Sequence, residues 1–162
     1  MSRMIVVDPA KCTNCRMCEL ACSLATTGAF APAHSRIRIH AFPKEFKYIP
    51  LTCFQCAAAP CAKVCPAGAL VQGDGLVRFV KEACIGCRMC MLACPFGVIS
   101  FDSAEGLIAK CDTCGGEPEC VKFCTPRALD FRELEWGDMS KGRDFARRIA
   151  EAAQGLAPGR PA

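Results

Sequence analysis

The sequence predicts a small α+β protein with short antiparallel β-ribbons, a C-terminal helix and a core organised around sulfur. Three observations support this class: sixteen Cys occur among 162 residues, the Cys fall into repeated motifs, and brief apolar stretches flank turn signals. One Trp, one Tyr and ten Phe leave little large apolar surface to bury. Because small chains with thin apolar cores need cross-links or metals, we expect the Cys to stabilise the fold.

The strands are expected to be short and to lie between the Cys motifs. Residues 4–7 have the pattern of an edge strand, and residues 36–39 alternate polar and apolar side chains as a half-buried strand does. Gly73-Asp74-Gly75 between two apolar stretches is a hairpin signal, and a similar turn is expected at 103–106. The expected strands are residues 4–7, 36–39, 69–72, 76–80, 98–101 and 107–109.

The segment 137–162 has no Cys and carries many charges. Ser140 is a candidate N-cap, and Phe145 and Ile149 follow at helical spacing. We therefore expect an amphipathic C-terminal helix over 140–154 with a frayed tail, which packs either on its own chain or on a partner subunit.

Membrane-spanning and secreted classes are excluded at this stage. The chain has no run of about 18 apolar residues, so no membrane span is expected. The N-terminus lacks the features of a signal peptide and of a twin-Arg leader, which favours the cytoplasm. In a reducing compartment many Cys indicate metal or redox chemistry rather than disulfides.

The sixteen Cys form four groups of four, with none left over. Groups one and three have the spacing C-x2-C-x2-C-x3-C. Group two has the spacing C-x2-C-x4-C-x3-C, and group four has C-x2-C-x5-C-x3-C. Group one is Cys12, Cys15, Cys18 and Cys22; group two is Cys53, Cys56, Cys61 and Cys65; group three is Cys84, Cys87, Cys90 and Cys94; group four is Cys111, Cys114, Cys120 and Cys124.

This spacing is typical of [4Fe–4S] cluster ligation. Three closely spaced thiolates converge on one cluster, and in two-cluster bacterial ferredoxins the fourth Cys ligates the other cluster. The fourth Cys is expected to start a short helical or turn segment, and Pro66 and Pro95 directly after Cys65 and Cys94 prevent a regular helix there. Sixteen Cys predict four [4Fe–4S] clusters, with every Cys a metal ligand.

Other metal chemistries fit the pattern less well. Zinc sites usually show paired C-x2-C knuckles separated by a dozen or more residues, and the spacings are too close for a disulfide framework. The spacing of plant-type [2Fe–2S] proteins is absent, and His34 and His40, the two His, lie outside the Cys groups, as expected of surface or loop residues. Four Cys for every cluster leave no iron open for substrate, so no catalytic residue and no enzymatic activity are expected.

The formal charge of +4 does not indicate nucleic-acid binding. Sixteen thiolates holding four cluster cores bring the loaded protein to a net charge of roughly −4. The basic residues therefore offset cluster charge, and no nucleic-acid partner is expected.

Internal repeats divide the groups into two types. Residues 12–22 and 84–94 agree at eight of eleven positions, whereas groups two and four share a looser pattern after their last Cys. Two pairings remain open from the residues alone: one with two and three with four, or one with four and two with three. Arg16 and Arg88 occupy equivalent positions inside the loops; their charge either favours the reduced cluster or meets a partner's acidic rim, and otherwise they are solvated.

The sequence resembles the four-cluster iron–sulfur subunits of the DMSO reductase electron-transfer family, the polyferredoxins. The resemblance covers residues 4–132 and includes all sixteen Cys, the stretch 28–39 and Cys53-Phe-Gln-Cys-Ala-Ala-Ala-Pro-Cys61. In its short length and in the linker between groups one and two, the chain is most similar to the small electron-transfer subunit of tungsten aldehyde oxidoreductase complexes.

The resemblance implies two nested bacterial dicluster ferredoxin-like modules. The outer module would comprise 1–50 and 105–136, and the inner module 51–104. The implied ligand sets are Cys12, Cys15, Cys18 and Cys124 (set one); Cys53, Cys56, Cys61 and Cys94 (set two); Cys84, Cys87, Cys90 and Cys65 (set three); and Cys111, Cys114, Cys120 and Cys22 (set four).

The resemblance also implies a function. The chain would carry electrons between a catalytic subunit, such as a tungsten or molybdenum pterin enzyme, and a second redox partner, such as a flavin/NAD subunit or a ferredoxin. The alternatives are a subunit of a formate dehydrogenase, CO dehydrogenase or hydrogenase, a free polyferredoxin, and a maturation accessory protein. A relay open at both ends would also allow head-to-tail self-association.

Overall fold

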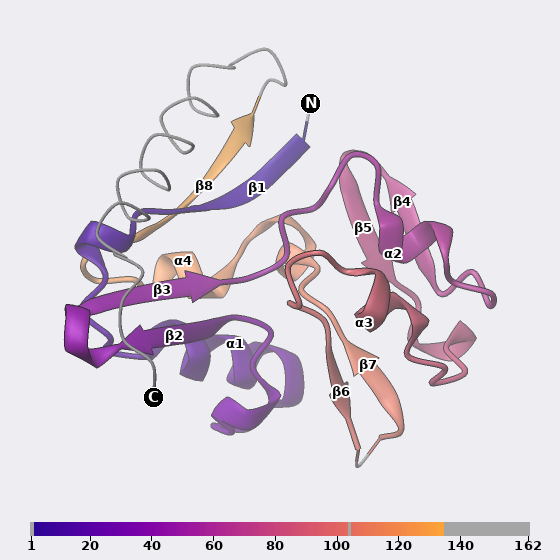
Figure 1. Cartoon of the computed structure of the whole chain (residues 1–162), viewed down its shortest axis with the longest axis horizontal. Coiled ribbons are helices and arrows are strands. Elements are labelled where there is room, and N and C mark those ends of the chain that lie inside the picture. Colours follow the sequence, from indigo (N-terminus) through magenta and orange to yellow (C-terminus); the bar gives the residue numbers. More distant parts are fainter. Residues whose placement is uncertain (1, 104, 135–162) are drawn as a thin grey trace, which may run out of the picture.

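The computed structural model describes residues 2–103 and 105–134, and this part of the chain is α+β as the sequence predicts (Figure 1). It contains four two-stranded antiparallel sheets and short helices between them. The expected C-terminal helix and tail at 137–162 lie outside the described residues.

The strands pair as four separate ribbons. β4 (Leu70–Gly73) and β5 (Leu76–Phe79) form the predicted hairpin, and Asp74 and Gly75 take the positive φ values of 51° and 75° that such a turn requires. β6 (Ser100–Asp102) and β7 (Leu107–Ala109) form the second predicted hairpin. The remaining bounds are β1 (Ser2–Val7) paired with β8 (Leu129–Leu134), and β2 (Arg38–Phe42) paired with β3 (Lys47–Leu51).

The strand expected at 36–39 starts two residues late, at Arg38. The Ser35 hydroxyl donates to the Ile37 carbonyl at 2.7 Å and accepts from the Ile37 N–H at 3.3 Å. These bonds occupy the backbone groups that a ladder would use, so pairing begins beyond them.

The expectation that the fourth Cys starts a helical or turn segment holds as a turn in groups two, three and four, whereas in group one Cys22 lies inside α1. The third Cys of every group lies near the start of a helix. The α-helices are α1 (Met17–Thr27), α2 (Pro60–Lys63), α3 (Met89–Ala93) and α4 (Glu119–Lys122); the 3-10 helices are η1 (Pro9–Lys11), η2 (Pro32–His34), η3 (Pro43–Glu45), η4 (Lys81–Ala83) and η5 (Thr113–Gly116).

Proline explains why α1 is longer than α3. Pro95 disfavours helical backbone at the preceding Cys94, so α3 ends at Ala93. No Pro follows Cys22, and α1 continues through Cys22 to Thr27, where Gly28, with a φ of 72°, ends it in the left-handed conformation.

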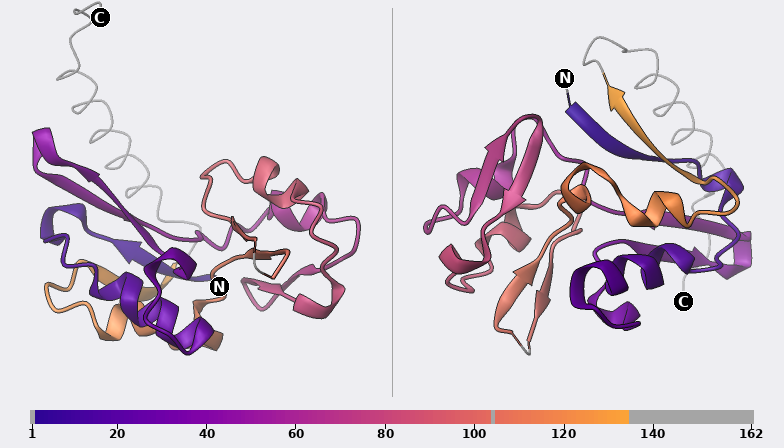
Figure 2. Two further views of the ribbon diagram at one scale, coloured as in Figure 1. Left: turned by 90° about the horizontal axis from the view of Figure 1, so that it is seen from below. Right: turned by 180° about the vertical axis from the view of Figure 1, so that it is seen from behind.

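The elements gather into two bodies (Figure 2). β1, β8, the β2–β3 ribbon, α1 and α4 form one body, and the hairpins β4–β5 and β6–β7 form the other with α2 and α3. The first core contains Ile5, Ile37 and Leu129 with Cys from groups one, two and four. The second contains Leu70, Val77, Ile99 and Ile108 with Cys from groups two and three. Cys are thus part of both cores.

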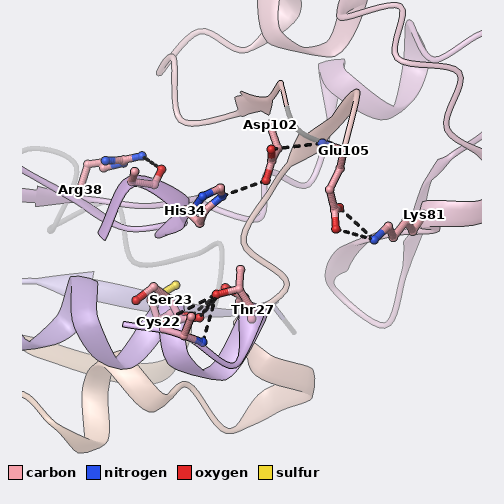
Figure 3. A network of polar contacts seen from close by, with 11 residues as sticks. Cys22, Ser23, Thr27, His34, Arg38, Lys81, Asp102 and Glu105 are labelled. Atoms are coloured by element: carbon pink, nitrogen blue, oxygen red, sulfur yellow. Dashed lines mark hydrogen bonds and ion pairs between the residues drawn. The ribbon is translucent and has the colours of Figure 1, made fainter. Parts of the chain in front are cut away.

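A polar link joins the two bodies at their surface (Figure 3). His34 of η2 contacts the Asp102 carboxylate, at the end of β6, through Nδ1 at 2.9 Å. The other Asp102 oxygen accepts the Glu105 N–H, and the Glu105 carboxylate pairs with Lys81 at 2.9 Å. Because the His34 and Asp102 side chains are partly exposed, this link orients the bodies more than it stabilises them.

Within the first body, buried Glu19 ties α1 to β2. Its Oε1 accepts the Ile39 backbone N–H at 2.8 Å, and its Oε2 lies 4.0 Å from Arg16 Nε. The Glu19 carboxylate thus accepts a backbone N–H of β2 that is not hydrogen-bonded to β3.

Glu19→Ala should lower the free energy of unfolding of the iron-loaded protein by about 1–3 kcal/mol, because the Ile39 N–H loses its acceptor in a buried site. Glu19→Gln keeps an amide oxygen at the same place and should lose less. Thermal unfolding followed anaerobically by circular dichroism distinguishes them; equal midpoints for the two variants would contradict this role.

Candidate iron–sulfur sites

The sixteen Cys form no disulfide and differ in exposure. Seven are buried, whereas Cys15 and Cys87, the second Cys of groups one and three, are exposed. The buried Cys are Cys18, Cys22, Cys53, Cys61, Cys90, Cys111 and Cys120; those of intermediate burial are Cys12, Cys56, Cys65, Cys84, Cys94, Cys114 and Cys124. The sites are therefore embedded in the cores, with an exposed edge in each of two groups.

The same backbone conformation recurs in all four groups. The residue before the second Cys has a positive φ: 58° at Asn14, 47° at Gln55, 68° at Gly86 and 59° at Thr113. Left-handed backbone is unfavourable for residues other than Gly, and most of all for β-branched Thr. Such conformations persist where the surroundings impose them, and turns of this kind direct successive N–H groups to one side, as in anion and iron–sulfur sites.

Several backbone N–H groups point at Cys sulfur. The fourth Cys of groups one, two and four accepts such a bond, from Arg36 to Cys22 at 3.3 Å, from Ala69 to Cys65 at 3.3 Å and from Ala128 to Cys124 at 3.2 Å. Hydrogen bonds to sulfur stabilise the thiolate over the thiol and tune iron–sulfur potentials.

In the first body, thiols from groups one and four lie near one another. Burial, with the Glu19 carboxylate next, raises the pKa of Cys18 to about 12. The thiols of Cys12 and Cys124 raise it in the same direction. Burial also raises the pKa of Cys114, with the Cys22 thiol among the further causes.

Cys120 shows the same convergence. Burial raises its pKa, and the thiols of Cys111, Cys22, Cys114 and Cys18 follow as causes.

In the second body, thiols from groups two and three lie near one another. Burial raises the pKa of Cys56, and the thiols of Cys53 and Cys94 add to the effect. Burial likewise raises the pKa of Cys90, with the Cys65 thiol acting in the same direction. Clustered thiols that resist ionisation alone are suited to a cationic metal core, which favours the thiolate form.

The two bodies meet at Cys111. Burial raises its pKa to about 11, opposed by a hydrogen bond from the Thr52 side chain. The thiols of Cys53 and Cys22 raise it further, so Cys111 lies near Cys of groups one and two.

The donor set fits [4Fe–4S] clusters. It consists of thiols gathered from separate loops in apolar surroundings, with N–H groups directed at sulfur. Among residues 2–103 and 105–134, no group of three or more His, Cys, Asp or Glu side chains is arranged so that it could hold a single metal ion.

Two positions that sequence reasoning singled out have specific surroundings. The Arg88 guanidinium lies 3.6 Å from the Phe101 ring centroid, and Arg16 pairs loosely with Glu19. Both Arg residues have positive φ and immediately precede a helix. Their influence on potential stays a prediction.

Lys110 and Gln55 were not predicted from the sequence. Lys110 is fully buried, and Gln55 is 1% exposed. A signal existed, because Lys110 follows the apolar strand β7 and directly precedes Cys111, where burial is expected for its neighbours.

No helix among the described residues is long and apolar enough to cross a membrane.

Family comparisons agree with this donor set. Residues 44–134, more than half of the chain, match the family described as 4Fe-4S dicluster domain, and residues 9–28 match the 4Fe-4S binding domain. Together the matches include all sixteen Cys.

Individual relatives are similar over most of the chain. The polyferredoxin-like subunit of aliphatic sulfonate oxidoreductase from Pyrococcus furiosus is 39% identical, over 90% of this chain and 91% of that protein. The B subunit of anaerobic dimethyl sulfoxide reductase from Escherichia coli is 35% identical, over 80% of this chain and 72% of that protein. A polypeptide of the active site complex BamBC of benzoyl coenzyme A reductase aligns at 29% identity and a TM-score of 0.48, covering 91% of this chain and 90% of that one.

Gly86→Ala should impair iron loading of the sites. A Cβ at Gly86 would lie 2.6 Å from the Gly106 carbonyl oxygen, and the φ of 68° disfavours Ala by about 1–2 kcal/mol before that clash. Iron per chain and the thermal midpoint should both fall.

Gly73→Ala is the matched control, because a Cβ there meets nothing within 4 Å and Gly73 is not among the residues with positive φ. Equal iron content in the two variants would contradict the steric argument.

Proposed function

The chain belongs to the 4Fe-4S dicluster domain family, and we propose that it is a non-catalytic electron-transfer subunit of an oxidoreductase complex. The observation that carries the proposal is the gathering of all four Cys groups into two adjoining bodies with no other ligand type required. Bound [4Fe–4S] clusters supply one-electron transfer. The chain supplies thiolate ligands, excludes water from the buried sulfurs and directs N–H groups at them.

Four ligand sets follow, each with three Cys of one group and the fourth Cys of its partner group. The neighbouring thiols favour this exchange: Cys18 is influenced by Cys124, Cys114 by Cys22, Cys56 by Cys94 and Cys90 by Cys65. The sets are Cys12, Cys15, Cys18 and Cys124; Cys53, Cys56, Cys61 and Cys94; Cys84, Cys87, Cys90 and Cys65; and Cys111, Cys114, Cys120 and Cys22.

The four sites can be placed in a spatial order, because thiols of one set raise the pKa of thiols in a neighbouring set. Cys120 of set four is affected by Cys18 of set one. Cys111 of set four is affected by Cys53 of set two, and Cys90 of set three by Cys61 of set two. The proposed order is therefore one, four, two, three, with the outer module (1–50 and 105–136) holding sets one and four and the inner module (51–104) sets two and three.

The two ends of this order coincide with the two exposed Cys. Cys15 belongs to set one and Cys87 to set three. Group three also carries exposed apolar side chains, with Ile85 at 69% and Leu92 at 84%, which supports a partner at this end. We propose that one end meets a catalytic subunit and the other a second redox partner.

The proposed catalytic partner is a tungsten or molybdenum pterin enzyme, such as an aldehyde oxidoreductase. The second partner is a flavin/NAD subunit or a ferredoxin. The similarity to subunits of sulfonate and dimethyl sulfoxide oxidoreductases supports an assembly of this general kind. The proposed compartment is the cytoplasm, because sixteen closely spaced thiols need reducing conditions to remain available as ligands.

The ligand exchange is tested by paired substitutions. Cys61→Ala/Cys94→Ala removes two ligands from one proposed site, so about twelve irons per chain should remain. The control Cys61→Ala/Cys65→Ala removes one ligand from each of two sites and should give three-iron clusters visible by electron paramagnetic resonance (EPR). A three-iron signal in the first variant, and none in the control, would refute the assignment.

The partner is tested by native anaerobic purification followed by metal analysis of the complex. About sixteen irons per chain are expected, with tungsten or molybdenum in equal ratio to the chain. Full iron with no co-purifying subunit would instead favour a free polyferredoxin or a maturation protein, and nickel in the partner would favour a hydrogenase or a CO dehydrogenase. Zinc in place of iron would overturn the whole proposal.

A further inference from the structure

Lys110 is a buried cation at the boundary between the two bodies. It follows β7 and directly precedes Cys111, and its side chain has 0% exposure to solvent. A buried charge is unfavourable unless hydrogen bonds satisfy it, and buried Lys is rare. Its burial here points to a role that an apolar residue of similar size would not supply.

Three acceptors surround the Lys110 ammonium. Its Nζ donates to the Val77 carbonyl at 2.6 Å, to the Cys111 carbonyl at 2.9 Å and to Gln55 Oε1 at 3.4 Å. Three acceptors match the three N–H donors of the charged form, whereas a neutral amine would leave one acceptor without a proton.

Gln55 holds these acceptors in place. Its Nε2 donates to the Cys111 carbonyl at 3.0 Å, and its Oε1 also accepts the Val77 N–H at 2.9 Å. Gln55 stands directly before Cys56 and is itself buried, so the cluster-binding loop of group two and the ammonium are fixed relative to each other.

The acceptors are all uncharged, so they leave the positive charge of Lys110 unneutralised. None of the ion pairs found in residues 2–103 and 105–134 includes Lys110. In surroundings of low polarity such a charge acts over a longer range than at the surface.

Gln55 links the charge to the ligands of set two. Lys110 Nζ lies 3.4 Å from Gln55 Oε1, and Gln55 directly precedes the ligand Cys56. The ammonium is thus held beside the cluster-binding loop of group two, where a positive charge favours added negative charge.

We propose that Lys110 sets the reduction potential of the cluster held by Cys53, Cys56 and Cys61, making it the more easily reduced of the two sites at the boundary between the bodies. The inference rests on the proposed function, because it requires a cluster in set two. One-electron reduction adds one negative charge beside the ammonium, with the electron supplied by the titrant or the redox partner, and no bond forms or breaks. Lys110 acts through its charge, since its hydrogen bonds go to oxygen atoms and not to a ligand sulfur.

The test is an anaerobic redox titration of the iron-loaded protein, followed by EPR. Lys110→Gln removes the charge but keeps a polar side chain. One of the reduction steps should shift to lower potential by about tenfold in its equilibrium constant, which is ~59 mV for a one-electron couple. Lys110→Arg retains the charge and should restore most of the shift.

Lys63→Gln is the matched control. Lys63 is exposed and lies two residues after Cys61, so the same chemical change in solvent should move every step much less. Gln55→Glu is the second variant. It keeps an acceptor for Lys110 while it neutralises the charge, and it should lower the same step.

The outcomes separate the two proposals. Fewer than four clusters in the unsubstituted protein would count against the proposed function itself. Full iron with unchanged potentials in Lys110→Gln and Gln55→Glu would overturn the inference about Lys110 alone. Loss of iron in both variants would also overturn it, because Lys110 would then be a requirement for assembly rather than for potential.

Discussion

Ligation of metal by thiolates is the constraint on which the rest of this structure depends. Seven of the sixteen Cys are buried, and they occupy the same cores as the few aliphatic residues, such as Ile5 and Ile37 in one body and Val77 in the other. Burial raises the pKa of several of these thiols, so a cluster of unligated Cys would be poorly suited to carry charge. Metal binding supplies the compensating positive charge and joins segments far apart in the sequence. The free energy of ligation is therefore part of the free energy of folding.

The same constraint explains the strained backbone. Four residue types, Asn14, Gln55, Gly86 and Thr113, adopt left-handed φ at the equivalent place in four loops. Only Gly86 does so without steric cost, and Gly86 also has the Gly106 carbonyl where a Cβ would lie. Because the other three carry side chains, the conformation follows from the geometry of ligand convergence rather than from local preference.

The sequence predicted what depends on local pattern. The family, the β4–β5 hairpin and the α+β class are confirmed. β3 was not predicted because Pro50 interrupts its apolar pattern, and Pro is tolerated there since the ribbon has only two strands. β8 pairs with β1, from which it is separated by most of the sequence, so local sequence pattern does not reveal this pairing. The burial of Lys110 was not predicted for a similar reason, because its acceptors come from group two and β5.

One residue type at the same position before two Cys groups has two different electrostatic environments. Lys11 and Lys110 occupy the same position, directly before the first Cys of groups one and four. Lys11 is exposed and pairs with Asp8 at 3.3 Å, so solvent and a carboxylate both weaken its field. Lys110 is enclosed by neutral acceptors where the bodies meet, so its field is retained. The position before the Cys is therefore not enough, and the packing of the two bodies against each other decides whether the charge can act on a neighbouring site.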